Sequence, residues 1–202
     1  MATVVLVRHA VTAATGSRLG GRTPAPLTEE GRAQAEAVAE RLARTRLAAV
    51  YASPVRRTLE TAATIAARQR RDVRELDGVQ EFDYGSWTDR SLKQLRRTRL
   101  FESIQQTPGR VTFPGGESFV AAQSRAVLAI EQVVNAHPDK ATIAVVSHAD
   151  VIKIVIAHYA GIQLDLFQRL VISPASVSQL ALPCRGIPRL LGLNDVSHLD
   201  RR

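Results

Sequence analysis

Apolar and polar residues follow one another in blocks that predict buried strands separated by amphipathic helices. Continuous apolar runs at 4–7, 49–52 and 143–146 are rich in β-branched side chains. Such short runs are typical of strands that helices cover on both faces of a sheet. Alternation at 176–182, followed by a second β pattern at 189–193, predicts a hairpin at the edge of that sheet.

Between these runs, apolar residues recur at the spacing of an amphipathic helix. Thr28 is expected to cap one helix, and Ser118 is expected to cap a second, longer one. Residues 151–157 are apolar nearly all round, as in a helix buried within a domain. Ser53 and Pro54 are predicted as the cap and the first residue of a further helix.

Strands that alternate with helices in this way indicate the α/β fold class. We predict a single domain over residues 1–202. Its architecture is expected to be a three-layer α/β/α sandwich, with a mostly parallel sheet and an antiparallel addition at the sheet edge.

The composition is compatible with a domain that needs no disulfide or metal to fold. A chain of 202 residues with 45% hydrophobic content buries enough surface for a stable core. Cys184 is the single cysteine, so a reducing compartment is expected. No apolar run is long enough to span a membrane, and the first strand follows the N-terminus too closely for a signal peptide. We therefore expect a cytoplasmic protein without a membrane partner.

The net charge of +8, from 27 Lys and Arg against 19 Asp and Glu, allows three interpretations. A basic surface can bind a nucleic-acid backbone, draw small anionic substrates to a cleft, or consist of solvated helix faces. The arginines gather at 68–74 and 90–99 without interleaved aromatic residues, so base stacking is not indicated. Solvated faces are the favoured interpretation, and no nucleic-acid partner is expected.

Candidate chemistry lies where the predicted strands end. Arg8 and His9 directly follow the first strand, at the carboxyl edge where open α/β sheets bind ligands. Arg56 lies in the first turn of the helix predicted after Pro54, where free backbone N–H groups also attract an anion. The loop at 10–28 is long and rich in glycine and proline, and we expect it to wall a pocket beside His9.

Together with segments downstream, these residues resemble a known family. The motifs, in chain order, are Arg8-His9, residues 53–62 (SPVRRTLETA), 81–87 (EFDYGSW), 114–118 (PGGES), Ser147-His148 and 194–199 (NDVSHL). They span nearly the whole chain and resemble the histidine phosphatase superfamily, in its phosphoglycerate-mutase-like branch. The resemblance implies that family's fold and phosphoryl transfer through a phosphohistidine.

The resemblance also implies roles for individual residues. His9 would attack phosphorus while its second ring nitrogen donates to a backbone carbonyl, and Glu81 would protonate the leaving oxygen. Proton donation requires the acid form of Glu81, so we expect burial to raise its pKa. The phosphoryl oxygens would be held by Arg8, Arg56 and His148. Further candidate substrate contacts are Thr15, Gly21 and Arg22. No metal or other cofactor is called for, since the histidines and the cysteine lack ligand spacing.

The sequence leaves three functions open. The short stretch before residues 114–118 favours a phosphatase with an open site, acting on a small phosphorylated metabolite. A phosphoglycerate-type mutase would use the same phosphohistidine but keep water out. A non-catalytic phosphate- or nucleic-acid-binding module is supported only by the basic surface and by Ala10 and Ala149, where family members usually carry glycine. Residues 91–118 are expected to cover the active site. The oligomeric state, a homodimer included, is left open.

Overall fold

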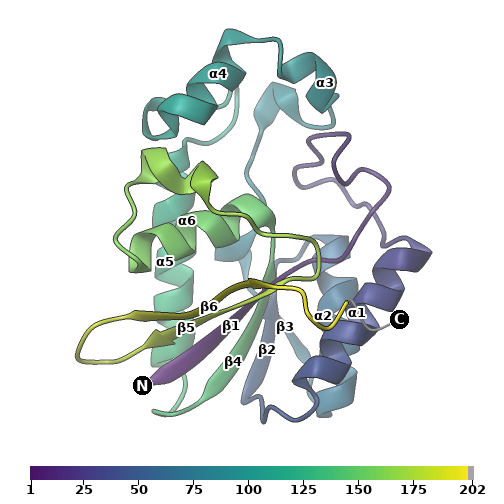
Figure 1. Ribbon diagram of the computed structural model, residues 1–202, viewed down its shortest axis with the longest axis vertical. Coiled ribbons are helices and arrows are strands. Elements are labelled where there is room, and N and C mark those ends of the chain that lie inside the picture. The colour runs from purple at the N-terminus through teal and green to yellow at the C-terminus, as the bar shows by residue number, and fades with distance from the viewer. Residues whose placement is uncertain (200–202) are drawn as a thin grey trace.

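A six-stranded sheet forms the centre of the computed structural model, which describes residues 1–199 (Figure 1). In chain order the strands are β1 (Ala2–Arg8), β2 (Ala49–Ala52), β3 (Val73–Glu75), β4 (Thr142–Ser147), β5 (Val177–Leu182) and β6 (Arg189–Asp195). They lie side by side in the order β3-β2-β4-β1-β5-β6. The first four of these are parallel, whereas β5 and β6 form an antiparallel hairpin at one edge, as predicted. Residues 200–202, the end of the predicted domain, lie outside the described residues.

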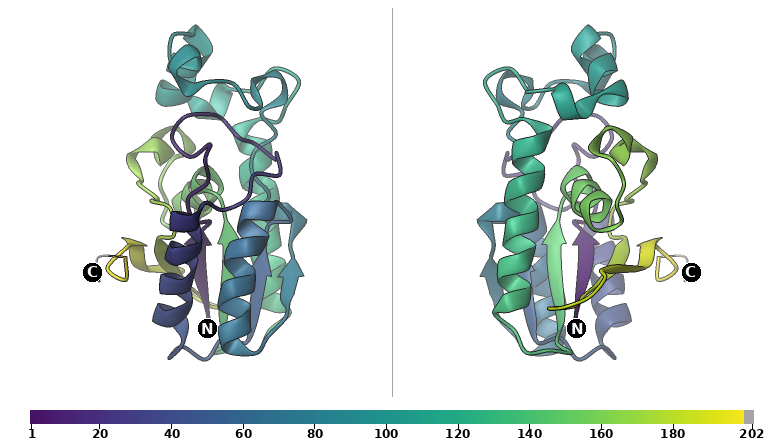
Figure 2. Two further views of the ribbon diagram at one scale, coloured as in Figure 1. Left: turned by 90° about the vertical axis from the view of Figure 1, so that its right-hand side faces the viewer. Right: turned by 90° about the vertical axis from the view of Figure 1, so that its left-hand side faces the viewer.

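Helices cover both faces of this sheet (Figure 2). In chain order they are α1 (Glu29–Leu42), α2 (Arg56–Gln69), α3 (Leu92–Leu95), α4 (Arg99–Gln106), α5 (Phe119–Asn135) and α6 (Ala149–Tyr159). Short 3₁₀ segments lie at Asp77–Val79, Gly85–Trp87, Pro108–Arg110 and Leu164–Arg169. Within residues 1–199, no helix is both long and apolar enough to cross a membrane.

Alternation along β1 divides the core into two layers. Val5 and Val7 share one apolar cluster with α1 and α2, whereas Val4 and Leu6 share the other with α5 and α6. Successive side chains of a strand point to opposite faces of the sheet, so one strand serves both layers. The predicted α/β class and three-layer sandwich are therefore confirmed. Helices α3 and α4 stand apart from the sheet, above the site end of the molecule (Figure 1).

Two of the predicted helix caps are confirmed. The Thr28 hydroxyl accepts a hydrogen bond from the backbone N–H of Gly31 at 3.0 Å, and α1 follows it. The Ser118 hydroxyl accepts from the N–H of Ala121 at 3.1 Å, and α5 follows it. Both hydroxyls satisfy N–H groups that have no partner within the helix.

The start predicted for α2 is wrong. The helix begins at Arg56 rather than Pro54, and Val55 occupies the cap position without a side-chain bond. Ser53 does not cap the helix because its hydroxyl lies 2.8 Å from Nε2 of His148. The residues of α2 that face the core are Arg57, Thr58, Thr61, Ala62, Ile65 and Ala66.

Strands β1 and β4 bring the two histidines together. The strands are adjacent and parallel, with Arg8 opposite Ser147. His9 and His148 each follow one of these residues, so both leave the sheet at the same edge. Their ring centroids lie 5.3 Å apart. This carboxyl edge is where open α/β sheets bind ligands, as the sequence predicted.

Candidate active site

His9 is buried and held in one tautomer. Its Nδ1 lies 2.8 Å from the carbonyl oxygen of Ala10, and because a carbonyl only accepts, Nδ1 carries the proton. The lone pair of Nε2 accepts a hydrogen bond from Nε of Arg57 at 3.1 Å. Burial, followed by the charges of Arg57 and Arg8, holds the pKa of His9 well below its usual range. The imidazole is therefore neutral near neutral pH and can act as a nucleophile. The backbone acceptor predicted for His9 is confirmed as the Ala10 carbonyl.

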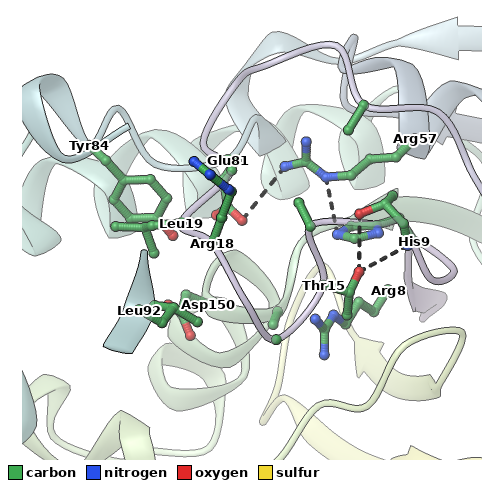
Figure 3. Close-up of a pocket in the computed structure, with 16 residues that line it drawn as sticks. Arg8, His9, Thr15, Arg18, Leu19, Arg57, Glu81, Tyr84, Leu92 and Asp150 are labelled. Atoms are coloured by element: carbon green, nitrogen blue, oxygen red, sulfur yellow. Dashed lines mark hydrogen bonds and ion pairs between the residues drawn. The ribbon is translucent and has the colours of Figure 1, made fainter. Parts of the chain in front are cut away.

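Arg57 supplies the guanidinium that joins the two histidines, and Figure 3 shows its bond to His9. Besides its bond to His9, it donates through Nη2 to Nδ1 of His148 at 3.0 Å. The same Nη2 donates to the carbonyl oxygen of Gly21 at 2.7 Å. The side chain is only 5% exposed, so water screens its charge less than it would at the surface.

The prediction that Arg56 lies in the site is wrong. Its side chain is 58% exposed and pairs with Glu60, one turn along the same helix, at 2.7 Å. Arg57, the next residue, lies on the buried face of the helix together with Thr61 and Ile65. Arg56 was predicted from its place in the first turn alone, and the phase of the buried residues was not applied, which is the source of the error.

His148 is fully buried at the start of α6. Its Nδ1 accepts from Arg57, so the proton lies on Nε2, which donates to the Ser53 hydroxyl at 2.8 Å. Burial, followed by the charge of Arg57, lowers the pKa of His148 well below its usual range. Like His9, it is a neutral imidazole with one nitrogen turned toward the guanidinium.

Glu81 reaches the same guanidinium from another element, and Arg57 lies between it and His9 (Figure 3). Its Oε2 is 3.9 Å from Nη2 of Arg57 and 3.8 Å from Nδ1 of His148. Its Oε1 accepts from the N–H of Phe82 at 3.1 Å. Burial outweighs the attraction of Arg57 and raises the pKa of Glu81 to about 7. The predicted rise is confirmed, and the group can give or take a proton near neutral pH.

The Gly-Gly-Glu motif holds the segment that carries Glu81. Oε1 of Glu117 accepts from the N–H of Asp83 at 2.8 Å. Arg125 grips the Glu117 carboxylate through two bonds of 2.9 and 2.6 Å, and it also donates to the carbonyl of Glu81 at 3.4 Å. A Cβ added to Gly116 would lie 2.2 Å from the carbonyl oxygen of Asp83. The motif therefore acts on the position of the carboxyl group.

Gly116→Ala is expected to lower the free energy of unfolding by about 1–3 kcal/mol, because the new methyl group overlaps the Asp83 backbone. The displaced segment carries Glu81, so kcat should fall as well. Gly192→Ala is the matched control, since no atom lies within 4 Å of a Cβ built there. Urea denaturation of both variants measures the difference. Equal stability of the two would contradict the close approach at Gly116.

Arg8 and Thr15 border a cavity of about 220 Å³ beside His9. Nη1 of Arg8 donates to the carbonyl of Ile172 at 2.7 Å, while its Nε is buried and has no hydrogen-bond partner within residues 1–199. The Thr15 hydroxyl accepts from the N–H of Thr12 at 2.9 Å. The predicted residues that line this cavity are Arg8, His9, Thr15 and Glu81, and Arg57 joins them.

Gly21 and Arg22 lie behind the cavity wall rather than on it. The Gly21 carbonyl holds Nη2 of Arg57. Arg22 donates through Nε to the carbonyl of Glu81 at 3.1 Å and lies 3.6 Å from Glu117. Both residues position charged groups of the site, and a direct contact with substrate stays a prediction for each.

Ser53 and Asp150 belong to the site without having been predicted as site residues, and Ser53 was expected only as a helix cap. Ser53 fixes the ring of His148. Asp150 lines the cavity, and its charge adds to burial in raising the pKa of Glu81. For Asp150, the available signal was its place two residues after a histidine at a strand end.

Comparisons with known proteins agree with this site. The model of the histidine phosphatase superfamily (branch 1) matches residues 4–196. Phosphoserine phosphatase 1 of Hydrogenobacter thermophilus is 30% identical over 202 residues, which cover 98% of this chain and 95% of that one. A probable phosphoglycerate mutase, GpmB of Proteus mirabilis, is 30% identical over 185 residues, which cover 89% of this chain and 85% of that one. The solved structure of Bacillus stearothermophilus YhfR has a TM-score of 0.92 at 28% identity and covers 99% of this chain and 100% of its own.

Paired histidines at the carboxyl edge of a phosphoglycerate-mutase-like sheet define a class of phosphoryl-transfer proteins. The chain belongs to the histidine phosphatase superfamily.

Proposed function

We propose that this protein hydrolyses phosphomonoesters of small metabolites in two steps, through a phosphohistidine at His9 and without a metal ion. The observation that carries the proposal is the convergence of a neutral His9, the Arg57 guanidinium and a protonatable Glu81 on one cavity. The relative named as a phosphoserine phosphatase supports it.

In the first step, Nε2 of His9 attacks phosphorus. An N–P bond forms, the P–O bond to the alcohol breaks, and Glu81 gives its proton to the leaving oxygen. The Arg57 N–H that bonds the Nε2 lone pair would turn to a phosphoryl oxygen, and the unpartnered Nε of Arg8 would bond another. Fixed cations around the transferring oxygens are the main requirement of such a transfer.

His148 can join these donors once the phosphate dianion has entered. A nearby anion favours the charged form of an imidazole, so it would raise the pKa of His148. Nδ1 would then carry a proton and donate to a phosphoryl oxygen, while Nε2–H stays on Ser53. In the second step, ionised Glu81 takes a proton from water, the water oxygen bonds to phosphorus, and the N–P bond breaks.

The choice between phosphatase and mutase depends on whether water reaches the phosphohistidine. Relatives with either name match at equal identity, so names do not decide it. The short stretch between the acid motif and the Gly-Gly-Glu motif supports an open site and hence a phosphatase. With phosphoglycerate as substrate, we expect inorganic phosphate to form and no isomer to accumulate. Isomer formation that outpaces phosphate release would favour the mutase.

Three further expectations from the sequence stay predictions. Residues 91–118 are proposed to cover the site, which is supported by Leu92 on the cavity wall. A cytoplasmic location is proposed from the single cysteine. A homodimer is proposed from the exposed leucines of β6 at the sheet edge, namely Leu190, Leu191 and Leu193.

A further inference from the structure

A second cavity, of about 340 Å³, adjoins the phosphate cavity beneath α3 and α4. Its walls are mostly apolar and include Trp87, Leu95, Phe101, Ile104, Phe113 and Phe119. All of these except Phe101 are buried in the core cluster, and Phe101 packs against it. The floor of this cavity is therefore built from buried rings and branched chains.

The two cavities share part of their lining on the side where the leaving group must lie. Leu19, Tyr84, Leu92 and Asp150 line both of them. Figure 3 shows these four residues on the side of Glu81 that faces away from His9. The leaving oxygen must lie opposite the attacking nitrogen and next to its proton donor. The rest of the alcohol is thereby directed toward the apolar cavity.

The polar side chains on the lining of this second cavity are fewer than the apolar ones; they are Arg96, Gln105, Asp150, Lys153 and Gln168. Lys153 pairs with Asp150 at 3.2 Å and donates to Gln168 at 3.0 Å, so these three are engaged with one another. Arg96 and Gln105 are exposed. A hydroxyl-rich or zwitterionic alcohol seated against the buried apolar walls would lose water there without gaining equivalent hydrogen bonds.

We propose that the preferred substrate is a phosphomonoester of a bulky apolar alcohol, either aromatic or branched. The body of the alcohol fills this cavity. This inference rests on the proposed hydrolase function. This class of substrate differs from phosphoserine, which appears in the name of one relative. Burial of the apolar body against the rings contributes to transition-state binding and so raises kcat/KM.

The test compares alkyl esters whose leaving groups have similar chemistry. We expect kcat/KM for 3-phenylpropyl phosphate to exceed that for propyl phosphate by at least about tenfold, with O-phosphoserine no better than propyl phosphate. Phe101→Ala should reduce the phenylpropyl-to-propyl ratio several-fold. Leu100→Ala, on the same helix but outside the cavity lining, should keep it. A ratio is unaffected by loss of folded enzyme, so a destabilised variant still gives a result.

The outcomes distinguish a failure of the proposed substrate preference from a failure of the proposed hydrolase function. Hydrolysis of all three esters with no preference for the phenylpropyl group, or an unchanged ratio in Phe101→Ala, would overturn the inference and leave the hydrolase intact. Absence of phosphate release from every ester would contradict the proposed function itself.

Discussion

Arg57→Ala should lower kcat/KM for phosphomonoesters by about 10³-fold, whereas Arg56→Ala should change it by less than about threefold. The two residues are neighbours in the sequence and have the same side chain. Arg57 is buried between His9 and His148, but Arg56 is exposed and bonded to Glu60. Removal of a buried guanidinium takes away stabilisation of the transition state, whereas removal of a guanidinium exposed to water does not.

Steady-state kinetics on both variants, with circular dichroism to confirm folding, make this comparison. Arg57→Lys is the useful third variant, because it keeps the charge but loses the fork that reaches several acceptors at once. It should recover only part of the lost activity. A larger effect for Arg56→Ala than for Arg57→Ala would show that the guanidinium assignment is wrong.

Glu81→Gln should lower kcat/KM for alkyl phosphates by about 10²- to 10⁴-fold, since the amide cannot give a proton to the leaving oxygen. Burial raises the pKa of Glu81 to about 7. The acid form is the active one in the first step, so kcat/KM of the native enzyme should fall as the pH rises through about 7. That fall reports the free enzyme and should be absent from the residual activity of Glu81→Gln.

Leaving-group chemistry provides the control for this prediction. An alcohol that leaves readily without protonation, as in p-nitrophenyl phosphate, needs less from a general acid. The loss in Glu81→Gln should therefore be much smaller for this ester than for an alkyl phosphate. Equal losses for both esters would contradict the role of Glu81 as proton donor.

Much of the fold could be predicted from the sequence because its signals are local. The apolar run of β1 and the capping hydroxyl of Thr28 each act over a few residues. The edge hairpin of β5 and β6 follows from the alternation at 176–182 and the second β pattern close after it at 189–193. By contrast, β3 is three residues long and two of them are exposed, so no apolar pattern marks it.

The site could be predicted at the strand ends and not at the start of α2. Ser53 and Pro54 have the composition of a cap and first turn, but Ser53 bonds His148, which lies 95 residues away. The residues around Ser53 give no indication of that tertiary contact. One usable signal was present: Arg57 lies one turn before Thr61 and on the same face as Ile65, the face that the core buries. Helical phase counted back from Ile65 would have selected Arg57.

The loop after His9 lines the cavity, as predicted, but the individual roles of Glu117 in the Gly-Gly-Glu motif and of Arg22 in that loop could not be predicted from the sequence. Glu117 and Arg22 are charged residues in glycine-rich segments, a composition that is equally typical of ligand binding. In the structure both residues hold the backbone around Glu81. The groups that they bond in this segment are a backbone N–H and a backbone carbonyl, which no residue pattern identifies.

The central claim is that phosphorus is bonded to His9 during turnover. Enzyme mixed with a radioactively labelled phosphomonoester should be quenched in alkaline denaturant, which preserves the N–P bond, and digested for peptide mapping. We expect label on the peptide that contains His9, formed and lost at rates compatible with kcat, and no label in His9→Ala. A native enzyme that releases phosphate yet never carries label on His9 would contradict the account.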